Sequence, residues 1–204
     1  MSSVPAQPTV YVVHDDASIR ELIEWLMRRD GIPVRTFAAA RDFLDACPPG
    51  APGCLVLDLY LPGMSGLELQ RDLAGRGIEM PVIFLSGRAD VPQAVQAVKG
   101  GAIDFIEKPF DYKRMVALVR DGLARDAEAR ERRRRGEAQR ARLASLSQRE
   151  REVLDRVVDG KPNRVIAEEL AISVKTVEAH RAHLMEKLEV DSVAALVQAA
   201  IASR

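Results

Sequence analysis

The chain has 204 residues, of which 47% are hydrophobic, with 30 basic residues, 30 acidic residues and two cysteines. This length suits one large core or two modest domains, and the balanced charge gives no overall sign of nucleic-acid or membrane binding. Two cysteines exclude a disulfide framework and a cysteine zinc site. Without a leader-like N-terminus or an apolar run of about 18 residues, the sequence predicts a reduced, soluble, cytoplasmic protein with no membrane segment.

Residues 10–122 alternate short apolar runs with amphipathic segments. Ile19, Leu22, Ile23 and Leu26 form the apolar stripe of a helix, and weaker stripes lie in 39–46, 66–74, 92–99 and 112–123. Runs as apolar as "CLVL" and "VIFL" leave no face for solvent, which indicates a parallel sheet covered on both sides. The predicted fold is therefore a small doubly wound α/β domain, with strands in "VYVV", "VRTF", "CLVLDL", "PVIFLS" and "IDFIE".

The segment from Gly122 to Ala144 is rich in Arg, Glu and Ala and has no substantial apolar stripe. Residues 120–144 carry nine basic and five acidic side chains, whereas the blocks on either side are nearly neutral. This composition predicts a solvated helical linker, with a nucleic-acid or partner-binding surface as the alternative. Gly136 is the expected weak point of such a helix.

From Leu146 onward only helical patterns occur. Ser147, with Glu150 three residues later, is the pattern of a capping box at the start of a helix, and Gly160 is the signal that ends the same helix. Further helices are predicted at about 162–171, 174–189 and 192–202, separated by two-residue turns. These segments predict a second, small, all-α domain of four helices.

Polar side chains stand at the ends of several predicted strands. His14, Asp15 and Asp16 follow the first strand, and Asp58 ends the third. In a doubly wound sheet, ligand chemistry collects at the carboxyl ends of the strands. Carboxylates gathered there repel one another unless a cation is bound, and Mg²⁺ commonly uses one or two carboxylates with waters and a phosphate.

Two further strand ends face the same predicted pocket. Ser86 ends the fourth strand, and Lys108 follows the fifth. A hydroxyl and a lysine beside Asp58 are the partners that a phosphoryl group on a carboxylate requires. An aspartate at a strand end is by itself more often a turn or cap residue, so the prediction depends on the joint pattern.

The stretches "VVHDDASIR", "LVLDLYLPGMSGLEL", "PVIFLSGRADVPQAV" and "GAIDFIEKPF" resemble, in order and spacing, the receiver domain of two-component response regulators. The resemblance covers nearly all of residues 9–122. It implies a flavodoxin-like five-stranded sheet in the order 2-1-3-4-5 and a cis bond between Lys108 and Pro109. The implied roles are a phosphoacceptor (Asp58), a switch pair (Ser86 and Phe105), a phosphate-contacting lysine (Lys108) and Mg²⁺ ligands (Asp15, Asp58 and the backbone carbonyl of Tyr60, with Asp16 as a further candidate).

The segment from "LSQREREVL" to the C-terminus resembles the LuxR-type helix-turn-helix of the FixJ and NarL groups, including FixJ- and TodT-like regulators. The resemblance implies a recognition helix from about Val174 to Leu188. Val177, Leu184 and Leu188 lie on its inner face, which leaves a mixed polar face suited to a major groove, although a merely solvated helix would look the same. The candidate DNA-binding residues are Asn163, Lys175, Thr176, Glu178, His180, Arg181 and Lys187.

The predicted organisation is a receiver domain at 9–122, a charged linker at 123–144 and a DNA-binding domain at 145–204. The main hypothesis is a transcriptional regulator, not an enzyme, that is phosphorylated by a sensor histidine kinase and dimerises on promoter DNA, with RNA polymerase as a further partner. The alternative keeps DNA binding but makes the receiver an atypical interaction module. A haloacid-type phosphatase is disfavoured because Tyr60 stands where a second catalytic acid is needed.

His14 departs from the receiver pattern. Alignment on Val13 and Arg20 puts His14 and Asp15 where receivers usually carry two adjacent acids, so His14 replaces the first acid. A register that pairs Asp15 with Asp16 would need a one-residue slip, which turns the strand's apolar residues to the wrong faces. In the first register we expect Mg²⁺ to bind more weakly than in a receiver with both acids, and more weakly still once His14 is protonated.

Overall fold

The computed structural model describes residues 7–87 and 91–201, which form two compact units, one ending at Arg130 and one beginning at Glu131. Residues 88–90 and 202–204, which belong to the two predicted domains, lie outside the described residues. No helix in the described ranges combines the length and the apolar composition that crossing a membrane requires. Both cysteines are free and buried.

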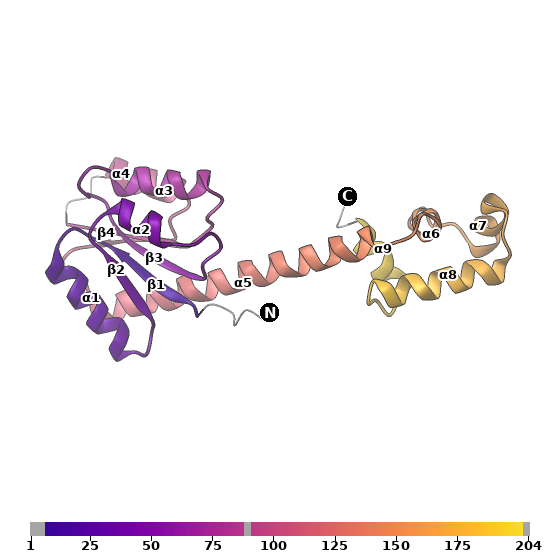
Figure 1. The fold of residues 1–204 in the computed structure, drawn as a ribbon, viewed down its shortest axis with the longest axis horizontal. Coiled ribbons are helices and arrows are strands. Elements are labelled where there is room, and N and C mark those ends of the chain that lie inside the picture. The colour runs from indigo at the N-terminus through magenta and orange to yellow at the C-terminus, as the bar shows by residue number, and fades with distance from the viewer. Residues whose placement is uncertain (1–6, 88–90, 202–204) are drawn as a thin grey trace. The chain divides into compact units, whose positions relative to one another are not determined.

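The first unit contains the predicted parallel sheet of five strands, in the order β2-β1-β3-β4-β5 (Figure 1). The doubly wound fold and its strand order are confirmed. The strands are β1 (Thr9–Val13), β2 (Val34–Phe37), β3 (Gly53–Asp58), β4 (Val82–Ser86) and β5 (Asp104–Glu107).

The strand register brings the chemically active strand ends to one edge of the sheet. Val13 at the end of β1 pairs with Leu57 of β3, and Asp58 pairs with Leu85 of β4. Ser86 in turn pairs with Glu107 at the end of β5. Because all these strands run parallel, the residues that follow them face the same side of the domain.

Helices cover both faces of this sheet, as Figure 1 shows. Helices α1 (Ala17–Arg29) and α5 (Tyr112–Ala144) pack on one face, while α2 (Ala40–Ala46), α3 (Gly66–Gly75) and α4 (Val91–Lys99) pack on the other. Alternate residues of β3 therefore enter two separate cores, as Leu55 and Val56 do. This two-sided burial is the reason that the central strands are almost wholly apolar.

Helix α5 continues through Gly136, and its first half is packed more closely than the sequence predicts. Asp126 is only 2% exposed and accepts hydrogen bonds from the backbone N–H of Gly53 at 2.9 Å and from Arg130 Nε at 2.6 Å. Arg130 also donates to the carbonyl oxygens of Gly50, at 2.6 Å, and Ala51. The expectation of a solvated linker from residue 123 is therefore wrong for this part of α5, which is tied to the loop before β3.

The second unit contains the last four helices. Ser147 and Glu150 form the predicted capping box at the start of α6, and Gly160 has a left-handed φ of 74° just after that helix ends. Ala171 adopts a left-handed conformation in the tight turn between α7 and α8. The four helices enclose one apolar core, and they are α6 (Gln148–Val158), α7 (Asn163–Leu170), α8 (Val174–Lys187) and α9 (Val193–Ile201).

We expect Asp126→Ala to lower the free energy of unfolding of the first unit by about 2–3 kcal/mol, because it leaves the N–H of Gly53 and the guanidinium of Arg130 without their buried acceptor. Urea denaturation followed by the fluorescence of Trp25, the single tryptophan, reports on this unit alone. Asp121→Ala is the matched control, since its pair with Arg125 on the same helix is exposed and should contribute less than about 0.5 kcal/mol. Equal losses in the two variants would contradict the role of Asp126.

Candidate functional site

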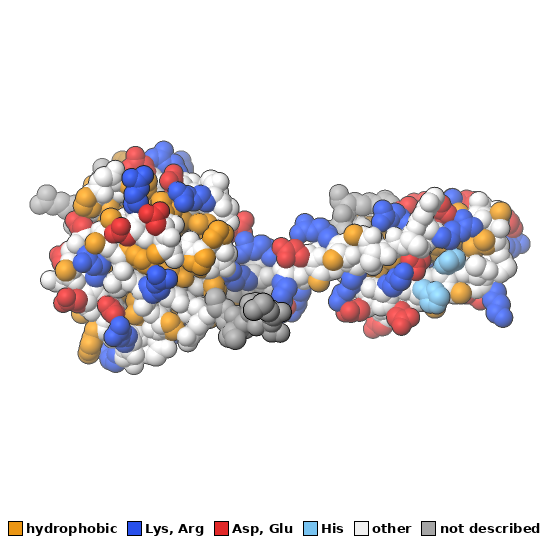
Figure 2. All heavy atoms as spheres, in the orientation of Figure 1, with side chains coloured by type: hydrophobic (Ala, Val, Ile, Leu, Met, Phe, Trp, Pro, Cys, Tyr) orange, Lys and Arg blue, Asp and Glu red, His pale blue; other side chains and the backbone are white. Residues whose placement is uncertain are grey.

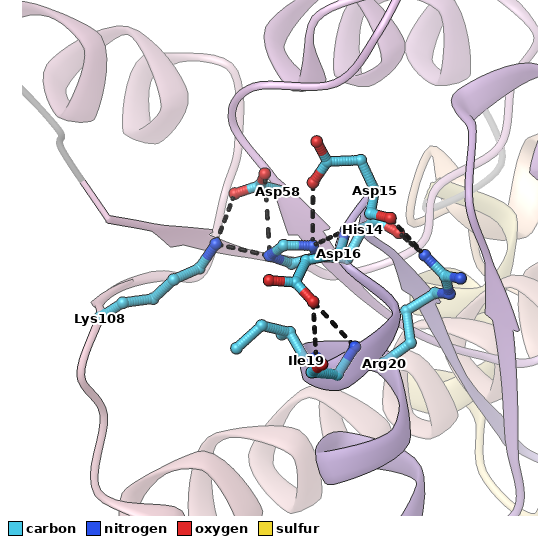
Figure 3. Close-up of polar contacts among 8 residues, drawn as sticks. His14, Asp15, Asp16, Ile19, Arg20, Asp58 and Lys108 are labelled. Atoms are coloured by element: carbon cyan, nitrogen blue, oxygen red, sulfur yellow. Dashed lines mark hydrogen bonds and ion pairs between the residues drawn. The ribbon is translucent and has the colours of Figure 1, made fainter.

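Asp58 lies at the centre of a polar pocket at the carboxyl edge of the sheet (Figure 3). Its side chain is nearly buried, with the residue 5% exposed, and Lys108 Nζ donates to its Oδ1 at 3.1 Å. The backbone N–H of Lys108 donates to the carbonyl oxygen of Ser86 at 2.8 Å, and the Lys108–Pro109 bond is cis, as predicted. The structure thus brings Asp58, Ser86 and Lys108 together, with a positive charge beside the buried carboxylate.

His14 occupies the same pocket and is only 3% exposed. Its Nε2 lies 2.5 Å from Lys108 Nζ and 3.8 Å from Asp58 Oδ2. On the other side of the ring, Nδ1 lies 3.2 Å from Asp15 Oδ1 and 3.0 Å from the backbone N of Asp16. The imidazole therefore stands between the two carboxylates, as Figure 3 shows.

The environment of His14 favours its neutral form. Burial lowers the pKa of the imidazole below its ordinary value of 6.5, and the ammonium of Lys108 lowers it further, against the opposing effect of Asp58. His14 therefore becomes protonated at a lower pH than an ordinary histidine. At neutral pH the ring contributes a nitrogen donor and no charge.

Asp16 does not join the pocket. Its Oδ1 caps helix α1 by accepting from the backbone N–H groups of Ser18 at 2.8 Å and Ile19 at 3.4 Å. These bonds lower the pKa of the Asp16 carboxyl, Ser18 first. This geometry uses one oxygen of Asp16 for the helix cap and favours the register in which His14 and Asp15 are the paired positions, while Asp16 as a cation ligand stays a prediction.

Arg20 is a pocket residue to which the sequence analysis assigned no role. One of its guanidinium nitrogens, Nη1, donates to the carbonyl oxygens of His14 and Asp15, both at 2.7 Å. Arg20 therefore holds the backbone of the loop that carries the imidazole and the carboxylate. The sequence signal that could have indicated this role is a basic residue one helical turn beyond the acidic loop.

The pocket offers donors that fit a divalent cation. One ligand atom each from His14, Asp15 and Asp58 can be chosen so that all three lie within 4.8 Å of one another. The two carboxylates supply the hard oxygens that Mg²⁺ prefers, so these residues fit that ion even with an imidazole beside them. The side-chain hydroxyl of Tyr60 donates to Gln93 at 2.7 Å, and the role of its carbonyl in cation binding stays a prediction.

Phe105, the predicted aromatic member of the switch, is half-buried in β5. Its ring stacks on Phe84, with the centroids 6.3 Å apart and the planes inclined by 18°. Phe84 lies in β4, two residues before Ser86. The aromatic ring and the serine thus lie on neighbouring strands, but its movement between two positions stays a prediction.

The inner face of α8 is buried as the helical periodicity predicts, at Val177, Leu184 and Leu188. Among the candidate DNA-binding residues on the other face, His180 is half-buried. Figure 2 shows histidine side chains at the surface of this unit. The exposed candidates near the start of α8 are Lys175, Thr176 and Glu178.

The remaining candidates are engaged within the unit. Arg181 Nη1 donates to Asn163 Oδ1 at 2.6 Å, and Lys187 Nζ donates to Glu150 Oε2 at 2.7 Å. Glu150 is buried, and the hydrogen bond from Lys187, followed by those from Ser147, lowers the pKa of its carboxyl to about 2. Lys187 is therefore the counterion of a buried carboxylate, a role that its position on a polar helix face did not reveal.

Comparisons with known families agree with both halves of this description. The family described as the response regulator receiver domain matches residues 10–120. A second family, described as bacterial regulatory proteins of the luxR family, matches residues 144–200. The fold and the pocket thus define a receiver domain joined to a LuxR-type DNA-binding domain.

Individual relatives extend over almost the whole chain. The chain is 45% identical over 199 residues to the transcriptional regulatory protein FixJ of Azorhizobium caulinodans, covering 97% of this chain and 94% of that protein. It is 43% identical to the transcriptional regulatory protein TdiR of Thauera aromatica, covering 93% and 83% of the two chains.

Solved structures show the same likeness. The structure of the response regulator StyR matches with a TM-score of 0.88 and 41% identity over 97% of this chain and all of that one. Full-length FixJ from B. japonicum matches with a TM-score of 0.60 and 36% identity, covering 97% and 98% of the chains. The chain therefore belongs to the response regulators of two-component systems, in the FixJ/NarL type that carries a LuxR-type DNA-binding domain.

We expect Glu150→Gln to lower the stability of the DNA-binding unit by about 2 kcal/mol at neutral pH, because it weakens a charge-assisted bond to Lys187. The folded-state pKa of Glu150 lies below its ordinary value of 4.5, so its stabilisation is complete above about pH 4.5 and is lost as the pH falls towards 2. Calorimetric unfolding of the full chain at several pH values measures this difference, with the transition not reported by Trp25 assigned to this unit.

Glu168→Gln is the matched control for this measurement, because Glu168 forms a solvent-exposed ion pair, with its Oε1 3.8 Å from Arg164 Nε. It should leave the pH dependence of the same transition unchanged. A wild-type transition that is insensitive to acid between pH 4.5 and 2, or one that both variants alter equally, would contradict the assigned role of Glu150.

Proposed function

We propose that this protein is a DNA-binding transcriptional regulator controlled by phosphorylation of Asp58 by a sensor histidine kinase. The observation that carries the proposal is the nearly buried carboxylate of Asp58 with Lys108 Nζ at 3.1 Å, at the carboxyl edge of a receiver sheet. Residues 9–122 would act as the receiver and residues 145–204 would bind DNA, with residues 123–144 between them. A kinase and chromosomal promoters as partners imply a cytoplasmic protein.

The proposed reaction is a phosphoryl transfer between two side chains. A carboxylate oxygen of Asp58 attacks phosphorus, the bond between phosphorus and the kinase histidine breaks, and the histidine leaves with the bonding electrons. Lys108 lies where it can neutralise the oxygens of the phosphoryl group. Asp15, Asp58 and the carbonyl of Tyr60 would hold Mg²⁺, which neutralises charge on the transferring group when it is bound.

The proposed signal passes from Asp58 to the other strand ends. New phosphoryl oxygens would draw the hydroxyl of Ser86 inward, and the space that it leaves would admit the half-buried ring of Phe105. The outer side of α4, β5 and α5 would then repack. This change would favour dimerisation of the protein on DNA.

Promoter recognition is assigned to the exposed first turns of α8. Lys175 and Glu178 are exposed there and can reach a major groove, and Thr176 is exposed with its hydroxyl 2.7 Å from that of Ser173. The segment 145–204 has nine basic and ten acidic residues, so one copy should bind weakly and two copies on paired half-sites should bind well. RNA polymerase is a further proposed partner at the promoter.

A second function has one observation in its favour. Lys108 Nζ lies 2.5 Å from His14 Nε2, so the lysine is shared between Asp58 and an imidazole that replaces an acid. The receiver would then be an atypical module, weakly phosphorylated or not phosphorylated, that a protein partner or ligand regulates. DNA binding by α8 is common to both functions.

Incubation of the full-length protein with a small phosphodonor and Mg²⁺ should add one phosphoryl group to Asp58, measured by intact-protein and peptide mass spectrometry. Asp58→Asn should remove the added mass, because the amide is not a nucleophile for phosphorus. Asp72→Asn, at an exposed position of α3, is the control and should be phosphorylated normally. Absence of a Mg²⁺-dependent mass gain, together with intact promoter binding, would instead support the atypical receiver.

Footprinting of the promoter beside the gene, with and without phosphodonor, should show stronger protection after phosphorylation. Lys175→Ala should weaken binding about 5–10-fold per bound copy and reduce the slope of log affinity against log salt by about 0.9 per bound copy, since each copy loses one phosphate contact. Arg41→Ala, at an exposed basic residue of α2 and therefore outside the face of α4, β5 and α5 that is proposed to repack, is the matched charge control. Equal effects of the two substitutions would remove Lys175 from the DNA contact surface.

A further inference from the structure

The cation pocket contains a nitrogen donor as well as oxygen donors. His14 is buried at the end of β1, and its ring lies among the two carboxylates of the three-residue group, Asp15 and Asp58. An aspartate in place of His14 would bring a third negative charge and a further oxygen ligand. The pocket of this chain therefore differs from an all-carboxylate pocket in both charge and donor type.

The contacts of the ring indicate which nitrogen can bind an ion. A proton on Nδ1 lets the ring donate to Asp15 Oδ1 at 3.2 Å and lets Nε2 accept from Lys108 Nζ at 2.5 Å. The other tautomer accepts from the backbone N–H of Asp16 at 3.0 Å, a hydrogen bond that the first tautomer gives up, but it sets an Nε2 proton against the ammonium of Lys108. The two contacts with charged groups favour the first tautomer, in which the lone pair of Nε2 is directed into the pocket.

This tautomer gives His14 the arrangement of a metal-binding histidine. A ligating histidine commonly donates its second ring N–H to a carboxylate, which orients the ring and strengthens it as a donor. Asp15 can fill that role at Nδ1, while Nε2 lies 3.8 Å from Asp58 Oδ2 on the other side of the ring. Nε2 and Asp58 share Lys108, whose side chain is partly exposed, so a cation that binds both groups would have to displace its ammonium.

The donor set decides which cation is favoured. Mg²⁺ is a hard ion that prefers oxygen and loses its waters reluctantly, so an imidazole in place of a carboxylate weakens its binding. First-row transition ions accept imidazole together with carboxylate, and their affinity for nitrogen rises from Mn²⁺ through the later metals of the row. Replacement of one acid by His14 should therefore cost Mg²⁺ much more affinity than it costs such an ion.

We propose that the cation pocket of this protein is selective for an imidazole-accepting first-row transition ion over Mg²⁺. His14 Nε2 and Asp58 would be ligands of that ion, and Asp15, which is a ligand in the Mg²⁺ arrangement proposed above, would instead hold the His14 ring. The inference rests on the proposed function, because it names the cation of the same receiver pocket. It makes His14 a determinant of metal choice in this receiver.

The test uses chelator-treated full-length protein with Mn²⁺ as the probe. Electron paramagnetic resonance titration gives the Mn²⁺ affinity, and competition gives the affinity for Mg²⁺. Pulsed measurement of electron spin echo modulation reports whether a nitrogen-14 nucleus is coupled to the bound ion. We expect such a coupling in the wild type, and a preference for Mn²⁺ over Mg²⁺ about tenfold or more greater than in His14→Asp, which restores a carboxylate.

Two variants separate His14 from other sources of nitrogen. His14→Asp and His14→Asn should both lose the nitrogen coupling, although His180 and His183 of the second unit are unchanged in them. Circular dichroism and Trp25 fluorescence check that each variant is folded. A coupling that persists in the variants, or a wild type without coupling and with the same metal preference as His14→Asp, would overturn the proposal.

The phosphorylation assay distinguishes failure of this inference from failure of the proposed function. Phosphorylation of Asp58 in Mg²⁺, with no nitrogen coupling in Mn²⁺, overturns the metal choice and leaves the phosphorylation mechanism standing. Nitrogen coupling without phosphorylation in either ion upholds the metal site and overturns that mechanism. Wild-type protein that binds neither ion overturns the metal choice, whatever the phosphorylation result.

Discussion

The burial of the Asp58 carboxylate is the constraint on which the receiver pocket depends. Removing a carboxylate from water is costly unless a positive charge or hydrogen-bond donors replace the lost solvation. Lys108 supplies that charge from the end of β5, and the parallel sheet is what brings β3 and β5 to the same edge although 50 residues separate the two side chains. In the proposed reaction, the same positive charge neutralises the oxygens of the phosphoryl group. The ion pair of Asp58 and Lys108 therefore stabilises the fold and also takes part in the proposed phosphoryl transfer.

His14 changes the balance around that pair. The pocket has the carboxylates of Asp15 and Asp58 against one ammonium, and the third position is a buried ring whose pKa is lowered by burial. The ring also competes with Asp58 for Lys108. A single difference from the usual receiver pattern thus changes both the charge and the donor type of the pocket, because an oxygen anion is exchanged for a neutral nitrogen base.

The DNA-binding domain also contains a buried carboxylate that a lysine neutralises. Glu150 serves both as the capping-box acid of α6 and as a buried anion, and Lys187 at the end of α8 neutralises it. Arg181 is likewise held by Asn163 at the start of α7. Because these cations are engaged within the domain, the proposed DNA contacts fall on the exposed start of α8. Basic side chains on a recognition helix are therefore not equivalent, although they look alike in sequence.

The sequence by itself determined most of the helices and strands, the parallel sheet with its strand order, and the grouping of Asp58, Ser86 and Lys108 at one edge of that sheet. These features follow from local periodicity, from strand-end polarity and from a specific family resemblance. Only the tertiary structure decided that Asp16 caps α1, that Asp126 is buried and that Lys187 pairs with Glu150. In each case a charged side chain is engaged by a partner within the protein, and in most cases that partner lies far away along the chain. Periodicity shows which face of a helix is polar, but only the packed structure determines which polar groups remain available to a ligand.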